Sequence, residues 1–308
     1  MKILFMGTPD FAVLCLDALI NNNYDVCGVV TQPDKPKGRG HKLMPPPVKE
    51  CAERNGISVY QPETLKDMAF LPTLKELNPD LIVVVAYGKI LPEYVLDYPK
   101  YKCVNIHASL LPKYRGAAPI QWAVINGDKK SGVTSMYMEK GLDTGDMIFK
   151  AEVEISPDET YGELHDDLAK LGAEVLIKTV KAIEDGTAPR EKQDDSKSCY
   201  ASMISKDTGH IDWECDADKI LNLIRGLNPF PMSYTIYGDE VMKIVTARYG
   251  GKRNGVAGSF QVNNRCLEIN CGGNEYITVD EIQMKGGKRM EVKSYLNGHS
   301  FDESVILK

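Results

Sequence analysis

The sequence lacks the patterns of several large protein classes. None of its eight cysteines belongs to a Cys-x-x-Cys pair, and no group of His and Cys has metal-ligand spacing, so we expect reduced thiols and no metal. Neither a Gly-x-Gly-x-x-Gly fingerprint nor a P-loop is present, which argues against a dinucleotide or nucleoside triphosphate site. The apolar start of the chain ends at Gly7, too early for a signal peptide or a membrane span. These absences predict a cytoplasmic protein that does not bind membranes.

The composition is that of an ordinary globular protein, 43% hydrophobic and 26% charged, in 308 residues. One hydrophobic core rarely serves more than about 250–300 residues, so we expect two domains. The net charge of −6 argues against binding of nucleic acid by bulk charge. It is compatible with a local basic patch, because exposed charges act over only about 8–10 Å in physiological salt.

Strands and helices alternate in the first half of the chain. The run at 80–86 is apolar without alternation, as expected of a central parallel strand covered on both faces. This alternation predicts an α/β fold with a doubly wound, mostly parallel, Rossmann-like sheet. The expected strands are 2–6, 26–30, 58–60, 80–86 and 102–106, and the expected helices are 11–22, 46–55 and 67–77.

The second half changes in texture. Strands near 132–138 and 147–155 and a helix near 160–185 complete the first domain, and a polar stretch follows. Several short strands after residue 233, separated by Gly and Asn turns, predict a small C-terminal β-barrel of OB-like type. We therefore expect a catalytic domain at 1–188, a linker at 189–205 and the barrel at 206–308.

Asn105 and His107 stand two residues apart at a predicted strand end, so their side chains share one side of the chain. Ligands of doubly wound sheets bind outside the carboxyl ends of the strands, which here also include residues 7–9 and 87–88. An amide donor for an oxyanion and a group that moves a proton near neutral pH are what acyl transfer to an amine requires. The alternative is a structural strand end with a buried, hydrogen-bonded histidine.

Asp143 lies between Gly141 and Gly145 in the turn between two predicted strands. Glycines permit tight turns, so we interpret them as allowing the carboxylate to approach a ligand closely. Asp143 would then orient His107 or act as a base. The alternative is an Asp-Thr-Gly hairpin turn with no role in chemistry.

Two basic segments are candidates for contact with RNA. The loop at 34–42 is punctuated by Gly and Pro and is either functional or a solvated loop. The segment from Val241 to Leu267 contains no Asp or Glu, and a barrel with one basic face is suited to an RNA backbone. The cations are Lys35, Lys37, Arg39 and Lys42 in the loop, and Lys243, Arg248, Lys252, Arg253 and Arg265 in the barrel.

Short motifs follow one another along the chain at residues 6–12, 31–34, 38–40, 48–49, 107–120, 141–145 and 227–231. Together they resemble the methionyl-tRNA formyltransferases, a family of folate-dependent formyltransferases. The Asn–His–Asp set is shared by the wider folate formyltransferase group, whereas the basic loop and the C-terminal barrel narrow the acceptor to tRNA.

The resemblance implies 10-formyltetrahydrofolate as co-substrate and methionyl-initiator tRNA as partner, with no metal and no nicotinamide. It implies Asn105, His107 and Asp143 as catalytic residues. It implies that the loop cations enter the acceptor-stem region and that the barrel supports the tRNA inside its bend. We further expect a monomer. The residues implied for folate are Ser109, Leu110, Leu111 and Pro112, with the backbone of Tyr87 and Gly88 nearby.

Other functions are compatible with parts of this pattern. A formyltransferase acting on a small amine, such as glycinamide ribonucleotide or an amino sugar nucleotide, or a formyltetrahydrofolate hydrolase would use the same Asn–His–Asp set. Each would leave the basic loop and the second domain without a role. An RNA-binding protein without catalysis would leave the strand-end residues unexplained.

Overall fold

The computed structural model describes residues 1–37 and 42–308. The chain folds into two compact units, each assembled from separate stretches of sequence. Unit 1 contains residues 1–119, 131–153 and 165–201, and unit 2 contains residues 120–130, 154–164 and 202–308. Among the described residues, none of the helices combines the length and hydropathy that a membrane span requires.

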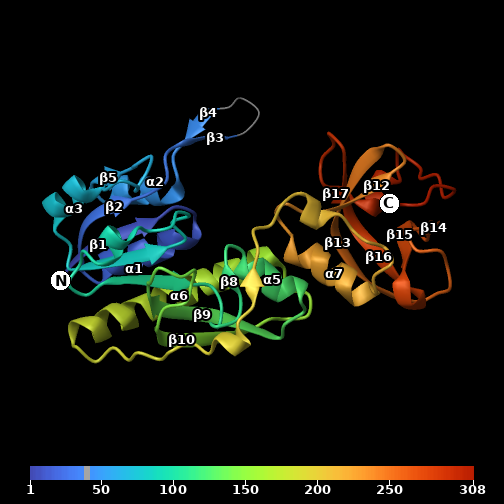
Figure 1. The fold of residues 1–308 in the computed structure, drawn as a ribbon. Helices are drawn as coiled ribbons and strands as arrows, with labels where there is room; N and C mark the ends of the chain where they lie inside the picture. The colour runs from blue at the N-terminus through green and yellow to red at the C-terminus, as the bar shows by residue number, and fades with distance from the viewer. Residues whose placement is uncertain (38–41) are drawn as a thin grey trace. The chain divides into compact units, whose positions relative to one another are not determined.

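Unit 1 is built on a seven-stranded sheet with the order β10-β9-β7-β6-β1-β2-β5 (Figure 1). The strands from β7 to β5 run parallel, and β9 is antiparallel to β7. All five residues of β6 are buried, as its uninterrupted apolar sequence predicts. The strands are β1 (Lys2–Gly7), β2 (Asp25–Val30), β5 (Val59–Tyr60), β6 (Leu81–Val85), β7 (Cys103–His107), β9 (Lys130–Tyr137) and β10 (Met147–Glu154).

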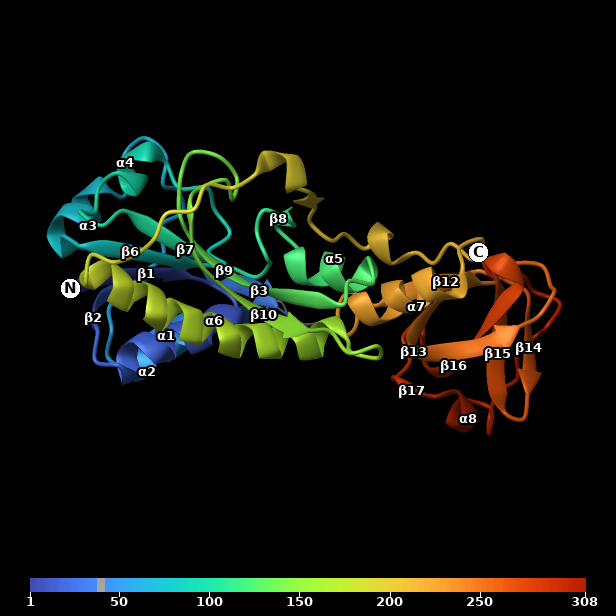
Figure 2. The same cartoon turned by 90° about the horizontal axis from the view of Figure 1, so that it is seen from below.

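Helices cover both faces of this sheet. Figure 2 shows α1, α2 and α6 on one side of the strands and α3 and α4 on the other. Asp10 begins the first of these helices by accepting a hydrogen bond from the backbone N–H of Phe11 at 3.0 Å. The predicted doubly wound, mostly parallel, Rossmann-like sheet is confirmed. The helices are α1 (Phe11–Asn21), α2 (Pro47–Arg54), α3 (Leu71–Leu77), α4 (Glu93–Leu96) and α6 (Tyr161–Glu184).

Two short strand pairs of unit 1 have no counterpart in the sequence-based prediction. The strands β3 (Lys35–Lys37) and β4 (Lys42–Met44) form an antiparallel pair that extends away from the sheet (Figure 1). β8 (Arg115–Gly116) pairs in parallel with β11 (Tyr200–Ala201). The polar segment before β11 therefore lies along unit 1 rather than spanning open solvent.

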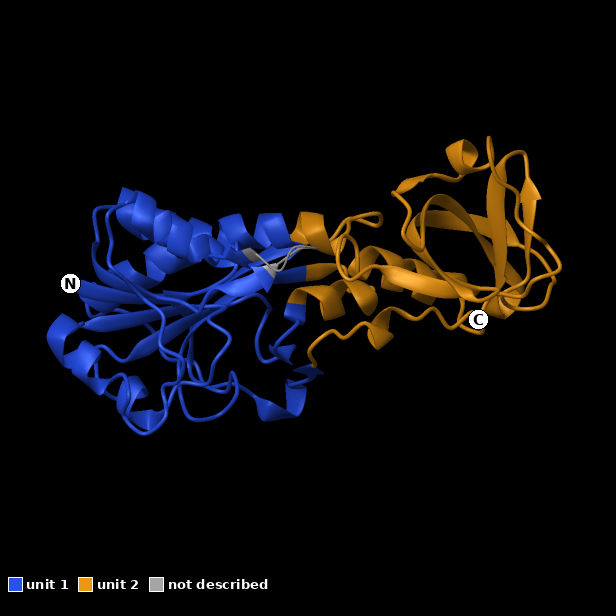
Figure 3. Ribbon diagram, turned by 90° about the horizontal axis from the view of Figure 1, so that it is seen from above, with its two compact units in different colours: residues 1–119, 131–153, 165–201 blue, residues 120–130, 154–164, 202–308 orange. Residues whose placement is uncertain are grey.

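Unit 2 contains a six-stranded antiparallel sheet with the order β12-β13-β16-β15-β14, and β17 pairs with β16. Its strands curl around a shared core, which α7 (Ala217–Gly226) helps to close (Figure 3). Register shifts in β13 add local bends to the longest strand. The predicted small C-terminal β domain is confirmed. Its strands are β12 (Ser233–Tyr237), β13 (Glu240–Lys252), β14 (Phe260–Asn263), β15 (Cys266–Cys271), β16 (Glu275–Met284) and β17 (Met290–Glu291), followed by α8 (Val292–Tyr295).

Arg225 joins the separate stretches of unit 2. Its guanidinium donates to the carbonyl oxygens of Glu159 at 3.1 Å and Val124 at 3.4 Å, and to the side chain of Asn222 at 2.9 Å. Burial lowers the pKa of this guanidinium from its ordinary value. One side chain of α7 thus fixes the two short segments that unit 2 takes from the middle of the chain.

Candidate active site

The carboxyl end of β7 carries Asn105 and His107. Asn105 pairs with Val84 of β6 on one side and with Met136 of β9 on the other, so the backbone at this point is fixed by two ladders. Its side chain is half-buried, and the amide has no hydrogen-bond partner among the residues that the structure describes. A rigid strand therefore holds a polar donor whose hydrogens are free for a ligand.

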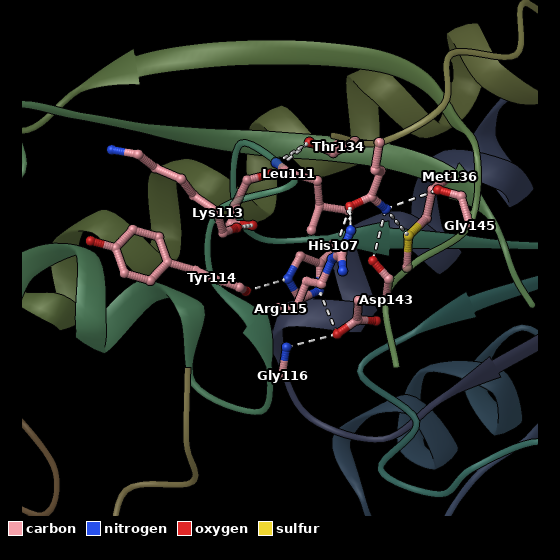
Figure 4. A network of polar contacts seen from close by, with 12 residues as sticks. His107, Leu111, Lys113, Tyr114, Arg115, Gly116, Thr134, Met136, Asp143 and Gly145 are labelled. Carbon is pink, nitrogen blue, oxygen red and sulfur yellow. Dashed lines mark hydrogen bonds and ion pairs between the residues drawn. The ribbon is translucent and has the colours of Figure 1, made fainter. Parts of the chain in front are cut away.

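His107 is held at both ring nitrogens (Figure 4). Nε2 lies 2.8 Å from the carbonyl oxygen of Tyr114, and Nδ1 lies 3.8 Å from Oδ2 of Asp143. Because a carbonyl oxygen only accepts, Nε2 carries a proton. The other ring nitrogen, Nδ1, faces the Asp143 carboxylate. At 3.8 Å this carboxylate leaves Nδ1 without a short hydrogen bond, so the nitrogen can also serve a reacting group.

Asp143 is fixed by its own backbone and by its neighbour across the site. Its φ of 53° lies in the left-handed region, which costs most residues about 1–2 kcal/mol, although Asp visits it more readily. Oδ2 accepts a hydrogen bond from the backbone N–H of Gly116 at 2.8 Å. The carboxylate is 13% exposed and the imidazole 7%. The structure thus brings Asp143 to His107, 36 positions earlier in the sequence, in a largely enclosed site.

The two glycines beside Asp143 permit a tight turn, as predicted. A Cβ on Gly145 would lie 1.8 Å from the carbonyl oxygen of Tyr137, and a Cβ on Gly141 would lie 2.2 Å from Oγ1 of Thr144. These glycines therefore make room for the chain's own atoms. That the Asp143 carboxylate approaches a ligand stays a prediction.

The segment after His107 is tied down by Thr134, a buried residue of β9 that pairs with His107 in the sheet. Its hydroxyl donates to the carbonyl of Ser109 at 2.7 Å and accepts from the backbone N–H of Leu111 at 3.1 Å. Sequence reasoning missed Thr134. A buried hydroxyl opposite a candidate histidine is visible only once the strand pairing is known.

The four residues implied for folate differ in what they expose. The Ser109 hydroxyl donates to the carbonyl of Lys113 at 2.7 Å, and the Leu111 side chain fills a small core cluster with Met136 and Met147. Leu110 and Pro112 are only half-buried. Side-chain surface for a ligand is therefore available on Leu110 and Pro112 rather than on Ser109 and Leu111.

Tyr87 follows β6 and is 1% exposed. Burial raises the pKa of its phenol to about 12, and the hydroxyl has no partner among the described residues. Its carbonyl oxygen accepts from Thr8 Oγ1 at 3.0 Å and from Gln32 Nε2 at 3.1 Å. Gly88 is exposed, with a positive φ of 83°. The ends of β1, β2 and β6 are thus joined by hydrogen bonds at one edge of the sheet, where the topology predicts a ligand.

Comparison with known proteins identifies the family. The formyl transferase family matches residues 1–180, and its C-terminal domain matches residues 203–300. Methionyl-tRNA formyltransferase of Clostridium acetobutylicum is 52% identical over 311 residues, and that of Clostridioides difficile is 49% identical over 309. Both alignments cover 100% of this chain and 100% of the relative. The chain belongs to the methionyl-tRNA formyltransferase family.

Solved structures of other formyl-transfer proteins share the fold. An N-formyltransferase from Helicobacter canadensis, in complex with folinic acid and dTDP-3-aminofucose, has a TM-score of 0.70 at 22% identity and covers 92% of this chain and 100% of its own. HypX from Aquifex aeolicus in complex with tetrahydrofolic acid has a TM-score of 0.63 at 15% identity and covers 96% of this chain and 47% of its own. These likenesses show that the fold is shared with other formyl-transfer proteins. In the described part of the chain, no group of three or more His, Cys, Asp or Glu residues could hold a metal ion.

The basic loop of this family member is anchored at its base. Lys49 donates to both carboxylate oxygens of Asp34 at 3.0 Å, and Gln61 donates to the same carboxylate at 2.7 Å. Lys35 and Lys37 lie on β3 and Lys42 lies on β4, while Arg39 lies outside the described residues. Asp34, at the start of the basic segment, is therefore held by two side chains.

In unit 2, most of the predicted RNA-binding cations already have partners. Arg248 forms an ion pair with Asp280, and Arg253 pairs with Glu268 while stacking 4.2 Å over the ring of Tyr276. The Lys243 ammonium donates to the carbonyl of Pro231 at 3.2 Å, and Arg265 donates to the carbonyl of Lys293 at 2.9 Å. Lys252 is exposed and has no partner among the described residues. The neighbouring strands β15 and β16 supply the carboxylates that the acid-free segment itself lacks.

Proposed function

We propose that this chain transfers the formyl group of 10-formyltetrahydrofolate to the α-amine of methionyl-initiator tRNA. It would act as a cytoplasmic monomer without a metal. The observation that carries the proposal is the His107–Asp143 pair beside the unpartnered Asn105 amide, in a chain about half identical over its whole length to methionyl-tRNA formyltransferases. We further propose residues 1–188 as the catalytic domain, 189–205 as the linker and 206–308 as the tRNA-binding domain.

In the proposed reaction the methionyl amine attacks the formyl carbon, and the carbonyl becomes an oxyanion in a tetrahedral intermediate. The bond between that carbon and N10 of the folate then breaks, and the proton lost by the amine ends on N10. Asn105 Nδ2 and the Nδ1–H of protonated His107 donate to the oxyanion. The absence of a hydrogen-bond partner for Asn105 in the described structure supports this assignment, since no bond has to be broken to make the donor available.

Asp143 would set the protonation and orientation of His107 and help to pass the proton onward. Its carboxylate faces Nδ1 of His107 across 3.8 Å, and the Gly116 N–H donates to that carboxylate. An enclosed site supports a strong effect, because charges interact more strongly where water is excluded.

The proposed binding residues lie along the chain on either side of this centre. Folate would contact Ser109, Leu110, Leu111 and Pro112, with main-chain atoms of Ser109 and Leu111 in place of their buried side chains. The main chain of Tyr87 and Gly88 would complete this set. The tRNA would contact Lys35, Lys37, Arg39 and Lys42, together with Lys243, Arg248, Lys252 and Arg253.

A competition assay tests the proposal. The purified full-length chain is given 10-formyltetrahydrofolate with methionyl-initiator tRNA, glycinamide ribonucleotide and a dTDP-amino sugar together, and each formylated product is quantified. The sugar nucleotide is included because a protein of the same fold is described in complex with dTDP-3-aminofucose. Formyl-methionyl-tRNA as the main product is the expected result. A formylated small amine as the main product, or folate turnover with water alone, would replace the proposed acceptor.

A further inference from the structure

The polar segment at 189–200 contains one residue that is not exposed. All twelve residues are described, and Gln193 alone among them is half-buried. Composition gives no reason for this difference, since the segment contains several other polar side chains of similar length. The cause is a set of hydrogen bonds between the Gln193 carboxamide and unit 1.

Both ends of the Gln193 carboxamide are used. Nε2 donates to the carbonyl oxygens of Asp143 at 2.7 Å and Gly145 at 2.9 Å. Oε1 accepts from Nε and Nη2 of Arg115 at 3.0 and 2.8 Å. Because a guanidinium only donates and a carbonyl only accepts, these partners allow a single orientation of the amide. Neither Glu nor an apolar side chain could reproduce this arrangement.

Arg115 is itself fixed. The Arg115 side chain is 12% exposed, and its guanidinium forms an ion pair with Asp195 at 2.6 Å. The next residue, Gly116, donates its backbone N–H to the Asp143 carboxylate. Asp143 is therefore held twice from the same stretch of chain, at its carbonyl through Gln193 and Arg115 and at its carboxylate through Gly116.

From this closed network we infer that Gln193 is a positioning residue for the reaction. Its amide hydrogens hold the backbone of Asp143 in the left-handed conformation that keeps the carboxylate 3.8 Å from His107 Nδ1. Arg115 orients that amide. The inference rests on the proposed function, and specifically on the role of Asp143. It assigns a part in catalysis to a segment that sequence composition marks only as a linker.

Gln193→Glu removes the donor half of the amide and keeps the acceptor half. A carboxylate still accepts from Arg115 but has no hydrogen to donate to the two carbonyls. Misplacing a catalytic group by about 1 Å costs on the order of 100-fold in rate. We expect kcat to fall about 10- to 100-fold, while KM for 10-formyltetrahydrofolate and for methionyl-tRNA stays within about threefold. Glu191→Gln, an exposed change two residues away, is the matched control and should retain the parent kcat.

Gln193→Met gives a second, uncharged variant of similar length that lacks both halves of the amide. If Gln193→Glu lowers the melting temperature too far for assay, the Met variant decides the question by the same kinetic criterion. A parent-like kcat in a folded Gln193 variant overturns the inference. A fall in kcat that merely follows the loss of folded protein in the thermal melt overturns it as well.

A double-mutant cycle with Asp143→Asn tests whether Gln193 acts through Asp143. The Asn variant keeps the main-chain carbonyl but loses the carboxylate charge. If Gln193 works by placing that charge, Gln193→Glu should change kcat by less than about twofold in the Asp143→Asn background, whereas independent effects would multiply. Multiplicative losses overturn the inference and leave the proposed function intact. Failure of the unmodified chain to formylate tRNA is a separate outcome, which overturns the proposed function itself.

Discussion

The polar side chains around His107 in unit 1 and the arginines Arg248 and Arg253 in unit 2 have different kinds of partner. Around His107, side chains are hydrogen-bonded to main-chain groups, and the Asn105 amide has no partner among the described residues. In unit 2, Arg248 and Arg253 are neutralised by carboxylates of the same sheet. In the proposed site the oxyanion donor has no partner within the part of the chain that the structure describes, whereas a row of cations in a sequence overstates the charge that a nucleic acid would meet.

The largest test of this difference is His107→Ala. We expect kcat to fall by about 10²–10⁴-fold, the usual contribution of a positioned acid–base group. Affinity for methionyl-tRNA, measured by filter binding, should change less than about twofold, because the proposed chemistry and the proposed RNA contacts reside in different side chains. Near-normal turnover would remove His107 from the mechanism, and the polar side chains around it could then no longer be regarded as a catalytic site.

Asn105→Ala should have the next largest effect, a loss of about 10²–10³-fold in kcat, typical of removing one oxyanion donor. The thermal stability of this variant should hardly change, because the Asn105 amide forms no hydrogen bond within the described structure. The comparison variant is Asn228→Ala in unit 2, whose amide donates to the carbonyl of Val245 at 2.9 Å. That change should lower the free energy of unfolding by about 1–3 kcal/mol and spare kcat. The opposite pattern would contradict the assignment of Asn105 as a free donor.

A smaller effect is expected from the cations of unit 2. Lys252→Ala should reduce the slope of log affinity for tRNA against log salt by about one, as for a lost phosphate contact. Arg248→Ala should reduce it less, because Asp280 already neutralises that charge, and Asp280→Asn should tighten binding. Equal slopes for the Lys252 and Arg248 variants would show that the internal ion pairs do not limit contact with RNA.

The smallest effect concerns His165 of α6, which contacts Asp10 at 3.5 Å and Asp166 at 3.0 Å. The hydrogen bond to Asp10 raises the pKa of His165, and the same bond lowers the pKa of Asp10. The stabilisation from His165 is present below its unfolded pKa of about 6.5 and is lost as pH rises through the higher folded value. That from Asp10 is present above about pH 4 and is lost as pH falls through the lower folded value.

His165→Asn should therefore lower the free energy of unfolding most between about pH 4 and 6.5, and little at pH 9. The cost should be on the order of 1 kcal/mol or less, since Asp10 is 76% exposed and water screens the pair. Urea unfolding of both proteins at pH 5.5 and pH 9 measures it, with kcat unchanged in the variant. A cost that grows toward pH 9 would reverse the sign of the coupling.

Much of unit 1 could be predicted because its signals are local. The apolar run of β6, the Asp10 cap of α1 and the spacing of Asn105 and His107 are each visible within a few residues. The approach of Asp143 to His107 is only one of two interpretations of its turn, since a turn sequence does not state which strand end it will reach, and the family resemblance favours it.

The features that could not be predicted depend on partners far away in the sequence. Gln193 bonds to carbonyls 48 and 50 positions earlier, and any residue offers a carbonyl, so no pattern marks the pair. The acid-free stretch of unit 2 meets Glu268 and Asp280 only because β15 and β16 lie beside it. Charge counted along the chain therefore differs from charge arranged on a sheet.

The anchoring of Arg225 to Val124 and Glu159 has a consequence for how such a protein can be recombined. Unit 2 owns residues 120–130 and 154–164, which interrupt the sequence of unit 1. A graft that exchanges everything after residue 202 with a relative would set a foreign α7 against these two native segments. The arginine at position 225 of the grafted helix would need the carbonyls of Val124 and Glu159 where they are now. Position 226 would need to stay glycine, because a Cβ there would lie 2.5 Å from the Ile125 side chain. We therefore expect a chimaera joined near residue 202 to fold poorly unless residues 120–130 and 154–164 are exchanged together with the graft.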